Sequence, residues 1–258
     1  MEGRNHSSGP GTLYVVGTGP GGLKHITPAA TDAIAASEVV VGYQTYLDLI
    51  PELLKGKEVV SSQMMKEVDR ARQCLEIAAS GKNVALVSGG DPGIYAMAGL
   101  VFEMARERDD KVTIEVIPGI AAINGCAARL GAPLMHDFAA ISLSDLLTPM
   151  ALIEKRLEAA ASADFVIALY NPKSKKRTEH IVRAREIILK HRGPETPVGI
   201  VTAGTRDHES VTLTTLDKML EAEIGMQSCV IIGNTSTFRW QDYMVTPRGY
   251  TGKYSLGD

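Results

Sequence analysis

Residues 83–97, "NVALVSGGDPGIYAM", place a glycine-rich turn directly after a short apolar run. Such a run is typical of a strand covered on both faces, because a half-exposed strand would alternate apolar and polar residues. The turn carries Asp91 where a phosphate-binding loop would carry a lysine. Ligands of open α/β sheets lie beyond the carboxyl ends of the strands, so this stretch predicts an α/β fold with a small-molecule site near residues 88–93.

Apolar runs of the same kind recur along the first half of the chain, separated by amphipathic segments. We expect buried strands at residues 13–17, 38–43, 57–60, 83–88 and 112–117. Threonine followed by proline predicts two helix starts, at Thr27 with Pro28 and at Thr148 with Pro149. Before the fourth strand, apolar residues three or four positions apart predict one helical face that Gly81 terminates, with Met64, Val68, Ala71, Leu75 and Ala78.

The second half predicts a further α/β domain with a mixed sheet. Its strands are expected at 164–171, 197–204, 210–216 and 228–234, and its helices at 149–161 and 177–191. Residues 210–216 alternate in polarity, which is typical of an antiparallel neighbour. The resulting division is a disordered lead-in at 1–10, an N-terminal domain at 11–137, a connection at 138–149 and a C-terminal domain at 150–258.

Bulk composition excludes several classes of protein. The 258 residues carry a net charge of −3, which gives no basic footprint for nucleic acid. We expect no membrane partner, because no apolar stretch approaches the roughly 20 residues of a membrane span. Three cysteines without C-x-x-C spacing predict core thiols in a reducing, cytoplasmic protein rather than disulfides or a zinc site. No metal-ligand set is predicted.

Two further glycine turns end predicted strands. Gly17, Gly19 and Gly22 satisfy the G-x-G-x-x-G pattern, but a dinucleotide site is disfavoured because Pro20 removes a backbone donor and the next helix is expected only after Thr27. The third turn, at residues 118–122, has small side chains that permit close approach of a ligand. Three turns at strand ends predict one converging site. For Asp91, ligand binding and capping of the following helix both remain open.

The ordered set of motifs resembles the tetrapyrrole methylase superfamily over about residues 12–250. The segments that carry the likeness are "VVGTGPGG" (15–22), "VSGGDPGIY" (87–95) and "IPGIAAINGCAARLGAPL" (117–134). The resemblance implies two α/β domains with a cofactor cleft between them and methyl transfer from S-adenosylmethionine. It also implies the cofactor-binding residues Pro20, Gly89, Gly90, Asp91, Ile94, Ala121, Ala122, Tyr170 and Gly204. Related enzymes often have Ser or Thr where Ala121 stands, so backbone groups would replace a side-chain hydrogen bond there.

Other segments are similar to cobalamin-pathway members that methylate carbon 17 of the macrocycle and contract the ring. These segments are "VVVGYQTY" (39–46), "GAPLMHDFAAISLSDLLTP" (131–149), "DFVIALYNPKSKKR" (164–177) and "YMVTPRGYT" (243–251). The resemblance implies a tetrapyrrole substrate, either metal-free or cobalt-bearing, and favours the cobalt-bearing one. It further implies a homodimer.

A tetrapyrrole with many carboxylates requires positive charge, and ring contraction requires proton transfer. The substrate-binding candidates are Lys173, Lys176, Arg177 and Arg248. The catalytic candidates are His136, Asp137 and Ser144, for which a structural hydrogen-bond cluster is the open alternative.

Alternative activities also stay open. Superfamily relatives methylate other tetrapyrrole positions or ribosomal RNA, and a non-catalytic domain that binds S-adenosylmethionine would carry the same glycine turns. The RNA alternative predicts aromatic side chains for base stacking, yet only 5% of the residues are aromatic.

Overall fold

The computed structural model describes residues 9–62 and 66–257. The predicted disorder of residues 1–8 and the predicted packing of Met64 therefore lie outside the described residues. Contacts between Cα atoms divide the chain into two compact units, residues 1–122 and 123–258. Each unit has its own five-stranded sheet.

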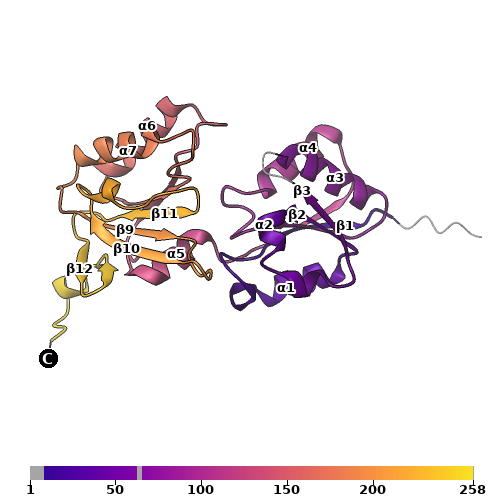
Figure 1. Cartoon of the computed structure of the whole chain (residues 1–258), viewed down its shortest axis with the longest axis horizontal. Coiled ribbons are helices and arrows are strands. Elements are labelled where there is room, and N and C mark those ends of the chain that lie inside the picture. Colours follow the sequence, from indigo (N-terminus) through magenta and orange to yellow (C-terminus); the bar gives the residue numbers. More distant parts are fainter. Residues whose placement is uncertain (1–8, 63–65, 258) are drawn as a thin grey trace, which may run out of the picture. The chain divides into compact units, whose positions relative to one another are not determined.

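The first unit is a parallel sheet in the order β3-β2-β4-β1-β5. Figure 1 labels its strands β1, β2 and β3 and its helices α1, α2, α3 and α4. All four strand pairs are parallel, so the carboxyl ends of the strands meet at one edge. Its strands are β1 (Thr12–Gly17), β2 (Val39–Tyr43), β3 (Glu58–Ser62), β4 (Val84–Ser88) and β5 (Thr113–Ile117). Its helices are η1 (Leu23–His25), α1 (Pro28–Ala36), α2 (Gln44–Leu47), η2 (Pro51–Leu54), α3 (Glu67–Ala79) and α4 (Ala98–Arg108).

Helices cover both faces of this sheet, which confirms the predicted strands and explains their apolar runs. Successive residues of a strand point to opposite faces. In β1, Val15 packs with residues of α3 and α4, whereas Val16 packs with residues of α1. The expectation of burial fails at the edges, where much of β3 and β5 is exposed, because an edge strand has a neighbour on one side only.

The helix-start predictions have different outcomes. Thr27 caps α1, since its Oγ1 accepts a hydrogen bond from the Ala30 N–H at 3.1 Å and Pro28 is the first helical residue. The Thr148 cap is wrong, because α6 (Met150–Ser162) begins one residue later with Pro149 at the N-cap position. In α3 the predicted face holds for Ala71, Leu75 and Ala78, but Val68 is exposed and Arg70 is buried instead.

The second unit contains a mixed sheet in the order β10-β9-β11-β8-β7. β7 and β8 are parallel and the remaining pairs are antiparallel, which confirms the predicted mixed sheet. Its strands are β7 (Phe138–Ser142), β8 (Val166–Tyr170), β9 (Pro197–Thr202), β10 (Ser210–Thr215) and β11 (Ser228–Ile232). Side chains of α6 and of α7 (Glu179–Leu189) share one core with it.

Further elements belong to this unit. Leu130 of α5 (Ala122–Leu130) packs against Gly199 of β9, where a Cβ would lie only 2.4 Å from the Leu130 Cδ1. A small sheet joins β6 (Gly131–Ala132), β13 (Tyr243–Val245) and β12 (Phe238–Trp240). Two short 3-10 helices are η3 (Met219–Glu221) and η4 (Tyr250–Gly252).

The domain boundary differs from the predicted one. Residues 138–149 were expected to connect two domains, but Phe138–Ser142 form β7 and pair with β8 along its whole length. The contact division instead falls between Ala122 and Ile123. A strand of small residues, such as the Ala139-Ala140 pair, lacks the β-branched run by which the other strands are recognised.

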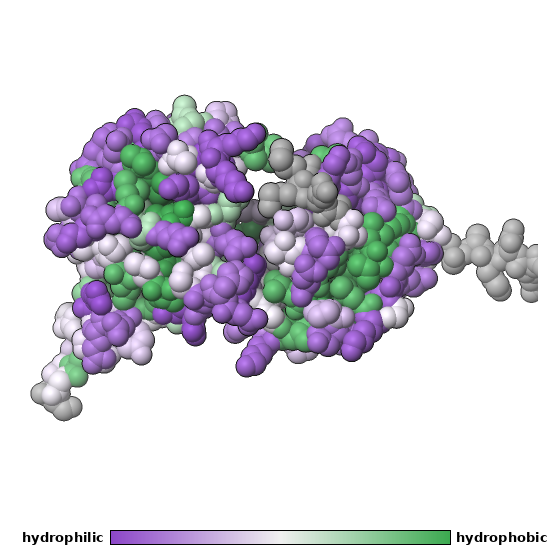
Figure 2. Space-filling model, viewed as in Figure 1, coloured by the Kyte–Doolittle hydropathy of each residue, from purple (hydrophilic) through white to green (hydrophobic). Residues whose placement is uncertain are grey.

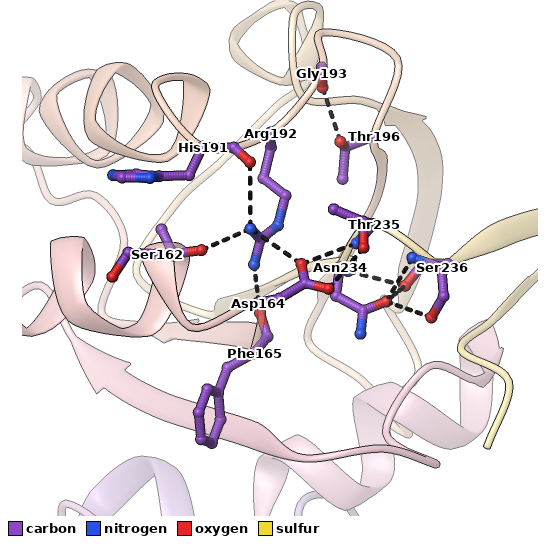
Figure 3. A network of polar contacts seen from close by, with 12 residues as sticks. Ser162, Asp164, Phe165, His191, Arg192, Gly193, Thr196, Asn234, Thr235 and Ser236 are labelled. Carbon is purple, nitrogen blue, oxygen red and sulfur yellow. Dashed lines mark hydrogen bonds and ion pairs between the residues drawn. The ribbon is translucent and has the colours of Figure 1, made fainter. Parts of the chain in front are cut away.

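A buried arginine ties together three segments of the second unit (Figure 3). Arg192 follows α7, and its side chain is only 2% exposed. Its guanidinium donates to the carbonyls of Ala161 at 2.6 Å and Phe165 at 3.1 Å. It also pairs with Asp164 at 3.1 Å, whose other oxygen accepts from the Thr235 hydroxyl at 2.6 Å. Burial lowers the pKa of Arg192, and Asp164 opposes that shift.

The three cysteines are free and buried, which confirms them as core thiols. Burial raises the pKa of the Cys74 thiol to about 12, and the positive charge of Arg70 offsets this in part. A hydrogen bond with Cys229 lowers the pKa of Cys126, and the same hydrogen bond raises the pKa of Cys229.

These shifts predict an order of thiol reactivity. Cys74 is expected to remain unalkylated by iodoacetamide at a pH of about 8.5, because only the thiolate attacks and this thiol stays neutral. Cys126 is expected to react before Cys74. Peptide mass spectrometry after timed alkylation measures the order, and the same reaction in guanidinium provides full labelling as the control. Labelling of Cys74 as fast as in denaturant contradicts the prediction.

Apolar patches lie among hydrophilic ones on the face of both units that Figure 2 shows. Within the described residues, no helix has the length and the apolar character needed to cross a membrane.

Candidate functional site

The three glycine turns of the first unit lie against one another at the carboxyl ends of β4, β1 and β5, which are adjacent strands. Gly19 and Gly90 exchange backbone hydrogen bonds, at 3.1 Å and 2.7 Å. The Thr18 hydroxyl donates to the Ser88 carbonyl at 3.0 Å, and Thr18 is buried. The predicted convergence of these turns is therefore confirmed within this unit.

Glycine is required where the turns meet. A Cβ on Gly119 would lie 2.2 Å from the Gly90 carbonyl oxygen, and a Cβ on Gly17 would lie 2.6 Å from the same oxygen. Both distances are shorter than any van der Waals contact, so no residue larger than glycine fits at positions 17 and 119. Gly22 differs, since a Cβ on it would meet nothing within 4 Å. The third glycine of the G-x-G-x-x-G pattern thus has no packing role, which agrees with the disfavoured dinucleotide site.

Asp91 joins two of these turns. Its Oδ1 accepts from the Gly93 N–H at 2.8 Å, and its Oδ2 accepts from the Gly119 N–H at 3.1 Å. The alternative in which Asp91 caps the following helix is wrong, because α4 begins at Ala98 with Met97 as its N-cap residue. A carboxylate has about four acceptor positions, so Asp91 retains capacity for a ligand hydroxyl while it holds the turns together.

Asp91→Asn is expected to lower the free energy of unfolding by about 1–2 kcal/mol, because the amide NH₂ cannot accept one of the two N–H groups and leaves it unpaired. Urea unfolding followed by circular dichroism measures the change. Asp242→Asn is the matched control, since the Asp242 side chain is 95% exposed. An effect as small as the control's contradicts the role of Asp91 as the link between the turns.

The other predicted cofactor residues of the first unit lie around this point. Pro20 and Ala121 are buried, Ala122 is half-buried and Ile94 is exposed. Gly89 lies against the ring of Tyr46, where a Cβ would be 2.5 Å from Cε1. Tyr46 was not predicted as a site residue. A tyrosine in a short helix after β2 carries no signal for this contact, which only the pairing of β2 with β4 creates.

Tyr170 and Gly204, the predicted cofactor residues of the second unit, lie at different strand ends. The Tyr170 hydroxyl, at the end of β8, accepts a hydrogen bond from the Ile123 N–H of α5 at 2.9 Å. Gly204 follows β9, and its neighbours Ala203 and Thr205 have left-handed backbones with φ of 50° and 67°. Such strain in non-glycine residues costs of order 1–3 kcal/mol each and concentrates at functional sites. Glu209, which was not predicted, holds this turn by accepting from the Thr205 N–H and from Arg129.

The predicted catalytic residues do not form one group. His136 and Asp137 precede β7 and Ser144 follows it, so the strand separates them. His136 is exposed, and its Nδ1 accepts from the Asp137 N–H at 2.8 Å. The Ser144 N–H, at the opposite end, donates to the Ser142 hydroxyl at 3.2 Å. The sequence places these residues close together in number, but an extended strand of this length moves its two ends about 17 Å apart.

A different polar cluster gathers at the carboxyl ends of β7 and β8. Asn171 donates to the Ser142 hydroxyl at 3.0 Å, and Arg177 donates to the Asn171 carbonyl at 3.1 Å. His180 lies 3.5 Å from the Asp145 carboxylate. Of these residues, the sequence analysis named only Arg177 as a site candidate. The sequence does not show that β7 and β8 pair in parallel, and this pairing is what brings the segments after both strands to the same edge of the sheet.

The predicted cationic residues do not all lie in this cluster. Arg177 belongs to it and is mostly buried. Lys176 is exposed and Lys173 is half-buried, both on the turn before α7. Arg248 lies elsewhere, in a hollow of about 250 Å³ that it lines with Gly249, Tyr250, Lys253 and Tyr254. Within the described residues, no group of three or more histidine, cysteine or acidic side chains is arranged to hold a metal ion.

Two buried hydroxyls at strand ends suit a polar ligand. Ser88 Oγ precedes Gly89, and Thr205 Oγ1 follows Gly204. Neither atom has a hydrogen-bond partner within the described part of the chain. Buried hydroxyls are normally paired, so the unpaired Ser88 hydroxyl of the first unit and the unpaired Thr205 hydroxyl of the second unit are each available to a polar ligand. Each stands beside a predicted cofactor residue of its own unit.

Comparison with known proteins shows a consistent likeness. Residues 12–220 match the family model described as tetrapyrrole (corrin/porphyrin) methylases. A cobalt-factor III methyltransferase of Priestia megaterium is 54% identical over 95% of this chain, although the chain spans only 46% of that relative's length. A probable cobalt-factor III C(17)-methyltransferase of Salmonella typhimurium is 46% identical over 93% of the chain and 99% of the relative.

The solved structures agree. The crystal structure of the methyltransferase CobJ superposes with a TM-score of 0.86 at 37% identity, covering 92% of this chain and 100% of the other.

Proposed function

The chain belongs to the tetrapyrrole (corrin/porphyrin) methylase family, and from this premise we propose that it transfers a methyl group from S-adenosylmethionine to carbon 17 of cobalt-factor III, with ring contraction. The observation that carries the proposal is the site where three glycine turns meet, which belongs to a chain 46% identical to a full-length relative of that name. The cobalt-bearing substrate is favoured over metal-free precorrin-3B because the relatives named for cobalt-factor III reach 54% and 46% identity, whereas a precorrin-3B C(17)-methyltransferase of Sinorhizobium sp is 42% identical.

The residues present fit S-adenosylmethionine. Gly17, Gly90 and Gly119 pack backbone against backbone, which holds the three turns together at the strand ends where ligands of open α/β sheets bind. Ala121 carries no hydroxyl, so at this position backbone groups would have to hold the cofactor. Within the first unit, the unpaired Ser88 hydroxyl adds a side-chain partner beside Gly89. When bound, the sulfonium supplies an activated methyl group.

The chain's own contribution is position and orientation. The macrocycle carbon is the nucleophile, so no protein nucleophile is needed, and holding two reactants in line can lower a barrier by roughly 7–11 kcal/mol. We assign the binding of substrate carboxylates to Arg177, Lys173 and Lys176. Arg248 lines a separate hollow and remains a further candidate for binding a substrate carboxylate. For proton transfer, Ser144 lies at the same strand end as Arg177, whereas His136 and Asp137 lie at the opposite end of β7.

The assembly and the location of the enzyme are proposed from the family resemblance alone. We propose a cytoplasmic homodimer. Light scattering after size-exclusion chromatography measures the mass in solution, and a monomer at micromolar concentration contradicts the dimer.

Anaerobic incubation with methyl-labelled S-adenosylmethionine and either cobalt-factor III or precorrin-3B, followed by mass spectrometry, tests the function. One added methyl group on cobalt-factor III is the expected result. Transfer only to precorrin-3B would move the enzyme to the metal-free substrate. Cofactor binding without transfer to either compound would overturn the proposed acceptor and favour a binding domain or another acceptor. His136→Ala, assayed beside Ser144→Ala, tests which strand end takes part in ring contraction.

A further inference from the structure

The loop at residues 143–149 follows β7 and has a firmly held first part. The Leu143 N–H donates to the Tyr170 carbonyl at 2.9 Å, and the Leu143 carbonyl accepts from His180 Nδ1 at 2.9 Å. These two bonds tie the start of the loop to β8 and to the first turn of α7. They also fix the orientation of the His180 ring, whose other nitrogen faces Asp145.

The next part of the loop is apolar and exposed. Leu146 is 73% exposed and Leu147 is 97% exposed, the highest fraction among the large apolar side chains in the described residues. Burying a leucine side chain instead of leaving it in water strengthens an association by about tenfold or more. Two adjacent leucines presented by a loop therefore offer a substantial apolar contact to a partner with an apolar surface.

Asp145 lies between this apolar pair and two basic side chains, and its contacts with them are loose. One carboxylate oxygen is 3.8 Å from Arg177 Nη1, and the other is 3.5 Å from His180 Nε2. A good charge-assisted hydrogen bond would be about 2.7–2.9 Å long. Arg177 also has donor capacity left, because its buried Nε atom has no partner within the described residues.

We propose that Arg177 and His180 form a carboxylate subsite for which Asp145 is an internal competitor, and that a tetrapyrrole carboxylate displaces Asp145 as Leu146 and Leu147 close over the apolar ring. This inference rests on the proposed function. Its occupant combines an apolar macrocycle with acidic side chains, which matches an exposed apolar pair beside a basic cluster. The exposed Lys175 and Lys176 add positive charge on the turn that leads to Arg177.

If Asp145 competes with the ligand, removing its charge should strengthen ligand binding rather than weaken it. Asp145→Asn removes the competing charge with little change of shape, so it is expected to tighten binding of an anionic porphyrin about fivefold. Leu147→Ser is expected to weaken that binding about tenfold, because the lost burial of one leucine corresponds to that factor. Titration of each variant with uroporphyrin III at an ionic strength of about 0.1 M, followed by porphyrin fluorescence, measures the dissociation constants.

Matched variants control for general charge and apolar effects. Asp242→Asn and Leu256→Ser remove an exposed acid and an exposed leucine far along the chain from this loop and are expected to change binding less than twofold. A tetracationic porphyrin in the same assay is expected to gain nothing from Asp145→Asn. In an Arg177→Met background the gain from Asp145→Asn is expected to fall below about twofold, because the two side chains act on the same ligand group.

Several outcomes overturn the inference. Weaker or unchanged binding by Asp145→Asn would make Asp145 a support for Arg177 rather than a competitor. An equal gain in affinity from Asp145→Asn in the Arg177→Met background would show that Asp145 merely repels the anionic porphyrin and does not compete for Arg177. Absence of anionic porphyrin binding by every variant also overturns it. Methyl transfer to cobalt-factor III by the same preparations separates these outcomes from a failure of the proposed function, which would abolish transfer whatever the effect at Asp145.

Discussion

Arg192→Met is expected to lower the free energy of unfolding by about 3–5 kcal/mol, because it removes two buried hydrogen bonds from a charged donor, each of which contributes about 1.5–3 kcal/mol. The guanidinium is 2% exposed and serves the carbonyls that end α6 and begin β8 as well as the Asp164 carboxylate. A methionine fills similar space but donates no hydrogen bond, so those carbonyls lose their partners in a place that water reaches poorly. Urea unfolding of the purified variants measures the loss.

Two variants define the mechanism of this effect. Arg183→Met on α7 is the matched control, because Arg183 pairs with Glu154 and Glu186 at the surface, where such pairs contribute about 0–1 kcal/mol. Arg192→Lys keeps the charge but has one donor group for several separated acceptors, so we expect it to recover less than half of the loss. Equal stability of the Arg192→Met and Arg183→Met variants would show that the network in Figure 3 contributes nothing special.

Gly119→Ala is expected to weaken binding of S-adenosylmethionine more than about tenfold, or to prevent it. The new Cβ would lie 2.2 Å from the Gly90 carbonyl oxygen and 2.8 Å from the Gly17 carbonyl, so two of the three turns must move apart. Overpacking of this kind costs about 1–3 kcal/mol in stability, which leaves the first unit folded while its cofactor site is distorted. Isothermal titration calorimetry with S-adenosylmethionine measures the loss, and circular dichroism verifies the fold.

Two other glycines provide controls. A Cβ on Gly22 or Gly99 would meet nothing within 4 Å. Gly22→Ala is therefore expected to bind the cofactor as the natural sequence does, although it belongs to the same turn as Gly17. Gly99→Ala lies inside α4 and is expected to raise stability by up to about 1 kcal/mol, because alanine has the higher helix propensity. Unchanged cofactor binding by Gly119→Ala would show that the contact between the three glycine turns is not part of the cofactor site.

Sequence reasoning predicted the parts of the molecule that repeat a local pattern. The strands of the first unit are apolar runs, and the mixed sheet of the second unit follows from the alternation in β10. The glycine turns could also be recognised, because each directly follows a strand. β7 was missed, since its alanines resemble a linker and its burial depends on β8 beside it.

Contacts between distant segments were beyond local patterns. Nothing near Asp91 in the sequence shows that its second oxygen faces Gly119, because that contact arises from β1 lying between β4 and β5. The grouping of His136 with Ser144 failed for the converse reason. Their residue numbers are close, which suggested that they are close in space. However, β7 lies between them, so they stand at opposite ends of this strand. His180 and Asp145 meet only because β7 and β8 run parallel.

The small sheet of β6, β13 and β12 bears on how the chain folds as it leaves the ribosome. Every strand pair of the first sheet lies between Thr12 and Ile117, so that sheet is complete before the second unit has been synthesised. β6 directly follows α5, but it pairs with β13 (Tyr243–Val245), which is synthesised more than 100 residues later. Domains generally fold as units in the order of their synthesis. We therefore expect the first unit to be compact on nascent chains, while β6 is paired last, when nearly all of this sequence has emerged.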